Sequence, residues 1–292
     1  DDLGRDVLAI PFVKGRKTEK EKFAGAMETY SIEALMPDGK GLQSGTTHYF
    51  GDGFARAFDI KFQGRDGKLA APHQTSWGVS TRLLGAIIMV HGDDNGLVLP
   101  PYVAPTQVVI VPIAQQKPGV IPAAREIYKK FQEAGLRVKL DESDRTAGWK
   151  FSEYEMKGIP LRVEVGPRDI ENGVVVLAKR NDGVKETVPM EKMVERAQEL
   201  MEQIHKEMYQ KAYRYLLDHI TEVHNMDELN AALEKGGYAK MMWCGDQECE
   251  DKIKELTNAT SRCMPFNQMA FDEVCPVCGK KAKKVVLFAK AY

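Results

Sequence analysis

The first hundred residues alternate short apolar and polar runs between glycines. Strand-like runs cover residues 29–35, 41–50 and 57–62, and this rhythm predicts an antiparallel sheet. Residues 80–91 break it, because Leu83, Leu84, Ile87, Ile88 and Val90 recur at helical spacing. We expect a helix there, largely buried against the sheet.

A second pattern follows, in which strand-like and helix-like runs alternate. A continuous apolar run at 108–111 and further strand-like runs at 136–140, 161–165 and 174–178 predict strands, and residues 121–134 and 149–157 predict helices. Alternation of this kind indicates an α/β domain with a mainly parallel sheet. The Asn181-Asp182-Gly183 tripeptide predicts a tight turn, and residues 191–219 predict a long helix with apolar residues at helical spacing.

These patterns divide the chain into four segments. We expect a partial antiparallel sheet with helices in residues 1–103, the α/β domain in 104–190, a linker helix in 191–224 and a small α+β domain in 225–292. Asn225 and Glu228 have capping-box spacing at the start of the last segment. A chain of 292 residues is long enough for two to three domains, each with its own core.

Composition excludes little. Hydrophobic residues make up 43% and charged residues 28%, which is typical of a globular protein and argues against disorder. The net charge of -1 gives no global footprint for nucleic acid, so any RNA contact needs a local basic patch. The apolar runs are too short to cross a bilayer, and the first residues do not form a signal sequence; we expect a cytoplasmic protein without a membrane partner.

Four of the five cysteines form two close pairs, Cys244 with Cys249 and Cys275 with Cys278. Four thiolates satisfy the tetrahedral preference of zinc and leave no open position, so this spacing predicts a structural Zn²⁺ site. Packing as small buried side chains is the alternative, and it is the better interpretation for the lone Cys263. The lysines after the second pair indicate a phosphate-facing patch or, equally well, a solvated face: Lys280, Lys281, Lys283, Lys284 and Lys290.

Arg82 lies where a glycine-bearing strand leads into the helix predicted at 80–91. A guanidinium in this place can bridge a nucleotide triphosphate, while small neighbouring residues let a base lie close to the backbone. Alone, an arginine near a helix start is more often a surface ion-pair partner.

Several ordered motifs together resemble prolyl-tRNA synthetases of the archaeal and eukaryotic-like type. They are GRKTEKEKFAG at 15–25, LQSGTTH at 42–48, QTSWG at 74–78, the Arg82 segment, HGDDNGLVLPP at 91–101, GWKFSEYEMKGIP at 148–160, VGPRD at 165–169, the cysteine pairs and the terminal FAKAY. The resemblance covers essentially the whole chain. It implies a proline--tRNA ligase that forms prolyl-adenylate from proline and ATP, with Mg²⁺, and transfers prolyl to tRNA(Pro).

The resemblance also implies roles for individual residues in the first segment. Arg82 matches the motif 3 arginine that contacts the ATP phosphates, and Gln43 and Ser80 accompany the nucleotide. Phe23, His48 and Trp77 match the wall of the proline pocket, with Thr46 on the same loop. Core packing is the alternative for Phe23 and Trp77, and a satisfied buried histidine is the alternative for His48.

In the family, the α/β domain reads two guanines of the proline anticodon. The matching residues are Phe151, Glu155, Arg162, Arg168 and Asp169. Their chemistry is suitable, because unpaired bases stack on aromatic rings and are read at their edges by arginine and carboxylate. Without the resemblance, Glu155 and Arg162 would be a plausible surface ion pair.

The chain departs from the family in one large respect. Motif 1, which builds the dimer interface, and motif 2, which supplies a second arginine, are expected upstream and are absent from this sequence. We therefore expect a fragment of a homodimeric enzyme, or numbering that begins after an upstream part. The alternative is a tRNA- or protein-binding module derived from a synthetase and without catalysis.

Overall fold

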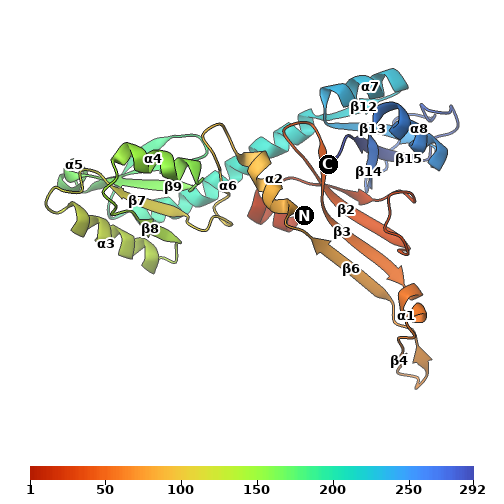
Figure 1. Ribbon diagram of the computed structural model, residues 1–292, viewed down its shortest axis with the longest axis horizontal. Helices are drawn as coiled ribbons and strands as arrows, with labels where there is room; N and C mark the ends of the chain where they lie inside the picture. The colour runs from red at the N-terminus through yellow and green to blue at the C-terminus, as the bar shows by residue number, and fades with distance from the viewer. The chain divides into compact units, whose positions relative to one another are not determined.

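The computed structural model describes residues 1–292 and divides into two compact units (Figure 1). Unit 1 consists of Asp1, Pro11–Ala86 and Arg214–Tyr292, and unit 2 consists of Asp2–Ile10 and Ile87–Tyr213. The four segments inferred from the sequence differ from this division, and their boundaries stay a prediction. None of the helices combines the length and the apolar character that a membrane span requires.

Unit 1 is built on one eight-stranded sheet. In spatial order its strands are β12 (Ile220–Val223), β13 (Tyr238–Trp243), β15 (Lys284–Ala289), β14 (Thr260–Pro265), β1 (Val13–Arg16), β2 (Glu28–Leu35), β3 (Gly41–Gly51) and β6 (Gln74–Val79). The antiparallel sheet expected near the N-terminus is confirmed, since β1, β2, β3 and β6 pair antiparallel. The sequence did not indicate that this sheet continues into the cysteine-containing segment.

The joint between the two halves of this sheet is the antiparallel pair β1 and β14. Gly15 lies opposite Pro265, and a Cβ atom at Gly15 would lie 2.2 Å from the carbonyl oxygen of Met264. Such a distance is far inside van der Waals contact, so only glycine permits this close approach of the two strands.

Two helices cover one face of the C-terminal strands. Leu229 and Leu233 of α7 (Met226–Lys235) and Ile253 of α8 (Gln247–Thr257) pack with Met241 and Phe288 of the sheet. The predicted cap of α7 is confirmed, because the Asn225 side-chain oxygen accepts a hydrogen bond from the Glu228 backbone N–H at 2.9 Å. The lone Cys263 is fully buried in a separate cluster on the other face, as expected for a packed thiol.

Unit 2 contains a five-stranded sheet in the order β11 (Lys185–Pro189), β10 (Val174–Lys179), β9 (Leu161–Val165), β7 (Val108–Pro112), β8 (Val138–Leu140). The prediction of a mainly parallel sheet is wrong: β7 pairs parallel with β8 and β9, but β9–β10 and β10–β11 are antiparallel. A parallel return after β9 would need a long crossover, and only the five-residue helix α5 (Pro167–Glu171) lies there. The predicted turn at 181–183 connects β10 and β11.

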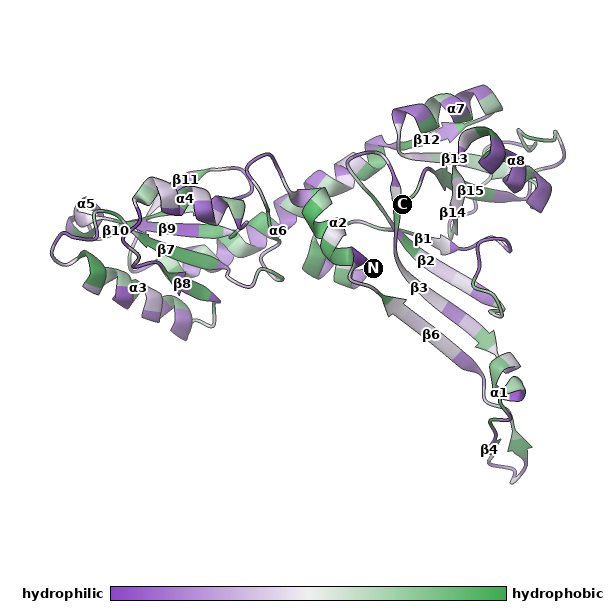
Figure 2. Cartoon of the chain, viewed as in Figure 1, coloured by the Kyte–Doolittle hydropathy of each residue, from purple (hydrophilic) through white to green (hydrophobic).

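Helices pack on both faces of this sheet. On one face, α3 (Val120–Glu133) and α6 (Met193–Asp218) contribute Ile127, Phe131, Ala197 and Leu200 to the core. On the other face, Tyr154 of α4 (Ala147–Met156) packs on β7. Figure 2 shows the pattern that directs this packing: β7 is apolar along its length, whereas α3 and α6 alternate apolar and polar residues. The six-residue π-type helix η1 (Leu3–Leu8) also belongs to unit 2.

Two local predictions are wrong. Residues 57–62 do not form a strand; the chain makes the short helix α1 (Gly53–Ala57) and then a small hairpin of β4 (Phe62–Gln63) and β5 (Leu69–Ala70). The helix α2 (Arg82–His91) exists but is not largely buried, because Leu84 is 62% and Ile88 50% exposed. Its apolar residues lie on two sides of the helix (Figure 2), and only the side with Leu83, Ala86 and Ile87 is covered.

Candidate functional site

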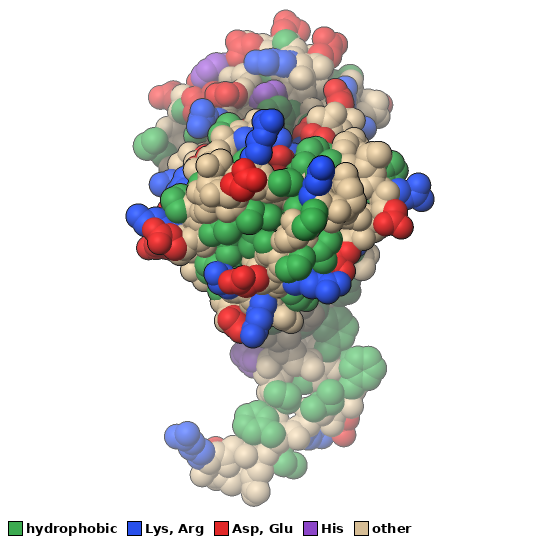
Figure 3. Space-filling model, turned by 90° about the vertical axis from the view of Figure 1, so that its left-hand side faces the viewer, with side chains coloured by type: hydrophobic (Ala, Val, Ile, Leu, Met, Phe, Trp, Pro, Cys, Tyr) green, Lys and Arg blue, Asp and Glu red, His purple; other side chains and the backbone are tan.

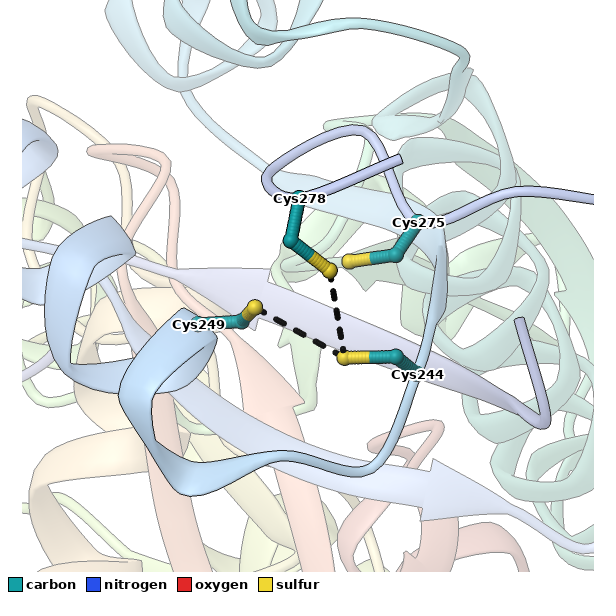
Figure 4. A group of neighbouring side chains, drawn as sticks. All are labelled: Cys244, Cys249, Cys275 and Cys278. Atoms are coloured by element: carbon teal, nitrogen blue, oxygen red, sulfur yellow. Dashed lines mark hydrogen bonds between the residues drawn. The ribbon is translucent and has the colours of Figure 1, made fainter. Parts of the chain in front are cut away.

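The four paired cysteines converge on one point at the end of β13 (Figure 4). Cys244 follows β13, Cys249 lies in the first turn of α8, and Cys275 and Cys278 come from the loop before β15. Their sulfur atoms all lie within 4.8 Å of one another, and Cys244 Sγ is 3.6 Å from Cys249 Sγ and 3.8 Å from Cys278 Sγ.

This arrangement fits a tetrahedral metal. Zinc–sulfur bonds of about 2.3 Å require sulfur atoms about 3.8 Å apart. Burial raises the pKa of the Cys244 and Cys249 thiols, while the backbone N–H of Lys280 lowers the pKa of Cys278. A cation is therefore needed to keep all four as thiolates at neutral pH. Lys280 itself pairs with Asp246 at 2.8 Å, so this lysine of the basic segment is engaged locally.

A second group of expected site residues lies on one face of β3. The Phe23 ring packs against His48 in a tilted arrangement, with ring centroids 4.9 Å apart and an interplanar angle of 47°, and Phe50 lies 5.9 Å from both rings. The Thr29 hydroxyl joins them, because it accepts from the Phe23 backbone N–H at 3.1 Å and lies 3.0 Å from His48 Nδ1. Burial lowers the pKa of His48, which favours the neutral ring at physiological pH.

Thr46 shares the face of His48, but Trp77 does not. Paired residues of an antiparallel sheet point to the same side, and successive residues alternate. Trp77 pairs with Thr47, whereas His48 pairs with Ser76 and Thr46 with Gly78. The Trp77 side chain is 77% exposed on the opposite face. The structure therefore brings Phe23, Thr46 and His48 together and leaves Trp77 apart.

Arg82 begins α2 directly after the last strand of this half of the sheet. Its Nη1 donates to the backbone carbonyl of Gln43 at 3.2 Å, and its backbone N–H donates to Ser80 Oγ at 3.3 Å. The structure thus brings the three residues assigned to the nucleotide together. The Arg82 side chain is exposed and forms no ion pair with a carboxylate, so its charge is available to a ligand.

Unit 2 contains its own cavity of about 480 Å³. Phe151, Glu155 and Arg162 line it, together with Tyr154, Asp93 and Arg180. The Arg162 guanidinium lies 4.0 Å above the Phe151 ring and pairs with Glu164 at 2.9 Å. Such a stack holds the planar donor group in place at the wall of the cavity.

Arg168 and Asp169 lie outside this cavity, in the short helix α5 after the far end of β9. The Asp169 carboxylate accepts the Gly166 backbone N–H at 2.7 Å, so it caps its own helix. Arg168 is exposed. Charged side chains of both signs surround an apolar centre on the face shown in Figure 3, and no single-sign patch dominates that face.

Two residues that contribute to these sites were missed in the sequence analysis. Thr29, which bridges Phe23 and His48, is 2% exposed, and the alternating polar residues Thr29, Ser31 and Glu33 of β2 are the signal that could have identified it. Arg180 was also missed; it forms a two-pronged ion pair with Asp93 at 2.6 and 2.7 Å at the rim of the cavity.

Comparisons with known proteins agree with the sequence motifs. Residues 226–292 match the family described as "Prolyl-tRNA synthetase, C-terminal", and residues 107–200 match "Anticodon binding domain". A protein named "Proline--tRNA ligase" from Lachnospira eligens is 56% identical over 292 residues, which is 100% of this chain and 61% of that protein.

Two further relatives carry the same name. One from Oceanobacillus iheyensis is 54% identical over 99% of this chain and 60% of its own length, and one from Clostridium botulinum is 53% identical over 99% and 61%. The chain therefore spans about three fifths of the length of the curated relatives that it matches.

Proposed function

Because this chain belongs to the prolyl-tRNA synthetase family, we propose that it supplies the nucleotide, amino-acid and tRNA-reading parts of a proline--tRNA ligase. The observation that carries this proposal is the face of β3 on which Thr46 and His48 lie: Phe23 packs against His48 there, and the same strand carries Gln43, the partner of Arg82. Substrates are proline, ATP and tRNA(Pro), and the setting is a cytoplasmic homodimer.

The chemistry follows from positioning and charge. The proline carboxylate attacks the α-phosphorus of ATP, the bond to the β-phosphate oxygen breaks, and pyrophosphate leaves. The Arg82 guanidinium stabilises the negative charge that moves from the α-phosphate to the departing pyrophosphate in this step. The Gln43 carbonyl orients the guanidinium, and the Ser80 hydroxyl fixes the Arg82 backbone. Mg²⁺ would supply further positive charge on the triphosphate.

The apolar ring of proline suits the surface formed by the Phe23 and His48 rings. A neutral His48 lets a small apolar ring pack without burying a charge, and a polar side chain in the same place would leave its groups unsatisfied. We assign no proline contact to Trp77, since its strand register points it to the other face.

For the tRNA we propose that the unit 2 cavity receives an unpaired guanine. Arg162 donates to the guanine edge, Glu155 accepts from it, and Phe151 supports the arginine. Arg168 and Asp169 then contact RNA beyond the cavity.

We also propose that the four cysteines bind one structural Zn²⁺. All four positions are protein ligands, so the ion closes the small α7–α8 subdomain and takes no part in catalysis. The rival proposal, a binding module without synthesis, does not account for an exposed Arg82 beside Gln43 and the Phe23–His48 face.

Zinc is expected at one equivalent in the purified protein. Cys275→Ser should remove most of it, because a hydroxyl is a poor fourth ligand for a site of thiolates, and should loosen residues 244–279. Cys263→Ser is the matched control, since that thiol lies outside the cluster. Elemental analysis that finds no zinc in the wild type, or full zinc in Cys275→Ser, would contradict the assignment.

Arg162→Ala in the full-length protein should lower tRNA charging about 5- to 150-fold, because a good arginine–base contact is worth about 1–3 kcal/mol. Proline-dependent pyrophosphate exchange should stay nearly unchanged, since that reaction needs no tRNA. Arg168→Ala should likewise lower tRNA charging and leave pyrophosphate exchange unchanged if RNA reaches α5.

The matched control is Arg125→Ala, an exposed arginine of the same unit that pairs with Glu142 away from the cavity. Both reactions should be unaffected in it. Equal losses of charging and exchange in Arg162→Ala would show that the residue does not read tRNA.

Arg82→Ala in the full-length protein should lower the rate of proline-dependent pyrophosphate exchange by about a hundred- to a thousandfold, the usual effect of losing one preorganised donor. Arg82→Lys should restore little, because an ammonium group cannot make a two-pronged contact. Arg56→Ala is the control, since this exposed arginine of unit 1 pairs only with Asp52. Unchanged exchange in Arg82→Ala would remove Arg82 from the active site.

A further inference from the structure

Residues 17–25, which form most of the connection between β1 and β2, are anchored at one end on helix α8. The Thr18 hydroxyl donates to Glu250 Oε1 at 2.9 Å, and Lys20 pairs with Asp251. Thr18 is 1% and Glu250 2% exposed, so this contact is shielded from water. The same hydroxyl also accepts the Glu21 backbone N–H at 3.3 Å, which shapes the turn that follows.

At its other end the same segment carries Phe23. The Phe23 ring contacts His48, and its backbone N–H donates to the Thr29 hydroxyl. Few residues separate the buried Thr18 contact from Phe23, and Phe23 itself is 52% exposed. The place of this ring on the β3 face therefore depends on how firmly the segment is held.

The anchor on α8 is itself part of a rigid structure. Glu250 Oε1 also accepts from the Ser261 hydroxyl of β14, and Glu250 follows Cys249, one of the four clustered cysteines. The first turn of α8 is thus fixed from both the sheet and the cysteine cluster. A hydrogen bond to such a turn restrains its partner far more than a bond to a mobile side chain.

We propose that Thr18 and Glu250 are positioning residues for the amino-acid side of the site. Through their buried hydrogen bond, α8 holds residues 17–25 so that Phe23 lies against His48. This inference rests on the proposed function for its kinetic consequence, but the restraint on the segment is independent of it. It assigns the cysteine-containing subdomain a role in amino-acid binding, in addition to its own folding.

The test compares Thr18→Val, which keeps the shape and removes the hydroxyl, with Thr18→Ser, which keeps the hydroxyl. Thr257→Val is the matched control, because it removes another buried hydroxyl of α8, which donates to the Ile253 carbonyl at 2.7 Å and forms no hydrogen bond with the segment. All three are made in the full-length protein, and metal content is checked to equal that of the wild type.

Hydrogen exchange is the first measurement. Thr18→Val should speed exchange of the amides at residues 19–25 about three- to tenfold, the effect of losing one ordinary hydrogen bond. Thr18→Ser and Thr257→Val should leave these amides near wild type. If Thr18→Val exchanges like the wild type at 19–25, or if Thr257→Val has the same effect there, the proposal is overturned.

Kinetics give the second measurement. Thr18→Val should raise the KM for proline about three- to tenfold in pyrophosphate exchange and leave the KM for ATP within about twofold. A change in kcat with both KM values unchanged would contradict a positioning role. If the wild type shows no proline-dependent exchange, the proposed function fails, and the hydrogen-exchange result still decides whether the segment is held through Thr18.

Discussion

The buried carboxylate of Glu33 joins the two halves of unit 1. Its Oε1 accepts from Lys17 Nζ at 3.0 Å and its Oε2 from Arg262 Nη2 at 2.7 Å, and Lys17 also donates to the Arg262 carbonyl at 2.7 Å. Glu33 is 0% exposed and Lys17 3%. Removing one partner of such a group leaves an uncompensated charge, which typically costs about 3–5 kcal/mol.

The ion pairs of Glu33 stabilise the junction at which the two halves of the unit 1 sheet meet. Because β1 pairs with β14, the strands that carry the Phe23–His48 face and the strands next to α8 and the cysteine cluster form one continuous sheet. The lack of a Cβ at Gly15 lets the strands approach, and the Glu33 ion pairs sit next to that contact. The cysteine cluster at one end of this sheet and the Phe23–His48 face on its other half then share a single framework.

Local patterns predicted what depends on nearby residues. The cysteine spacing predicted the cluster, helical periodicity predicted α3, α4 and α6, and Asn225 predicted a cap. Long-range pairing was not predictable: Arg262 and Glu33 are 229 residues apart, and no local signal joins β14 to β1. Motif resemblance named Trp77 and His48 together, but strand register, which the motifs do not encode, separates them onto opposite faces. Motif resemblance likewise assigned Arg162 and Arg168 to one anticodon site, but Arg168 lies outside the cavity that Arg162 lines.

The central claim is that the N-terminal strands of unit 1 (β1, β2, β3 and β6) and its cysteine-containing C-terminal strands (β12 to β15) unfold as one cooperative body because Glu33 joins them. Native-state hydrogen exchange on the most protected amides of β2 and β15, in the wild type and in Glu33→Gln, tests it directly. The account predicts that both strands open with the same free energy in the wild type and that the substitution lowers both together. A loss confined to β2, with β15 keeping its wild-type protection, would contradict it.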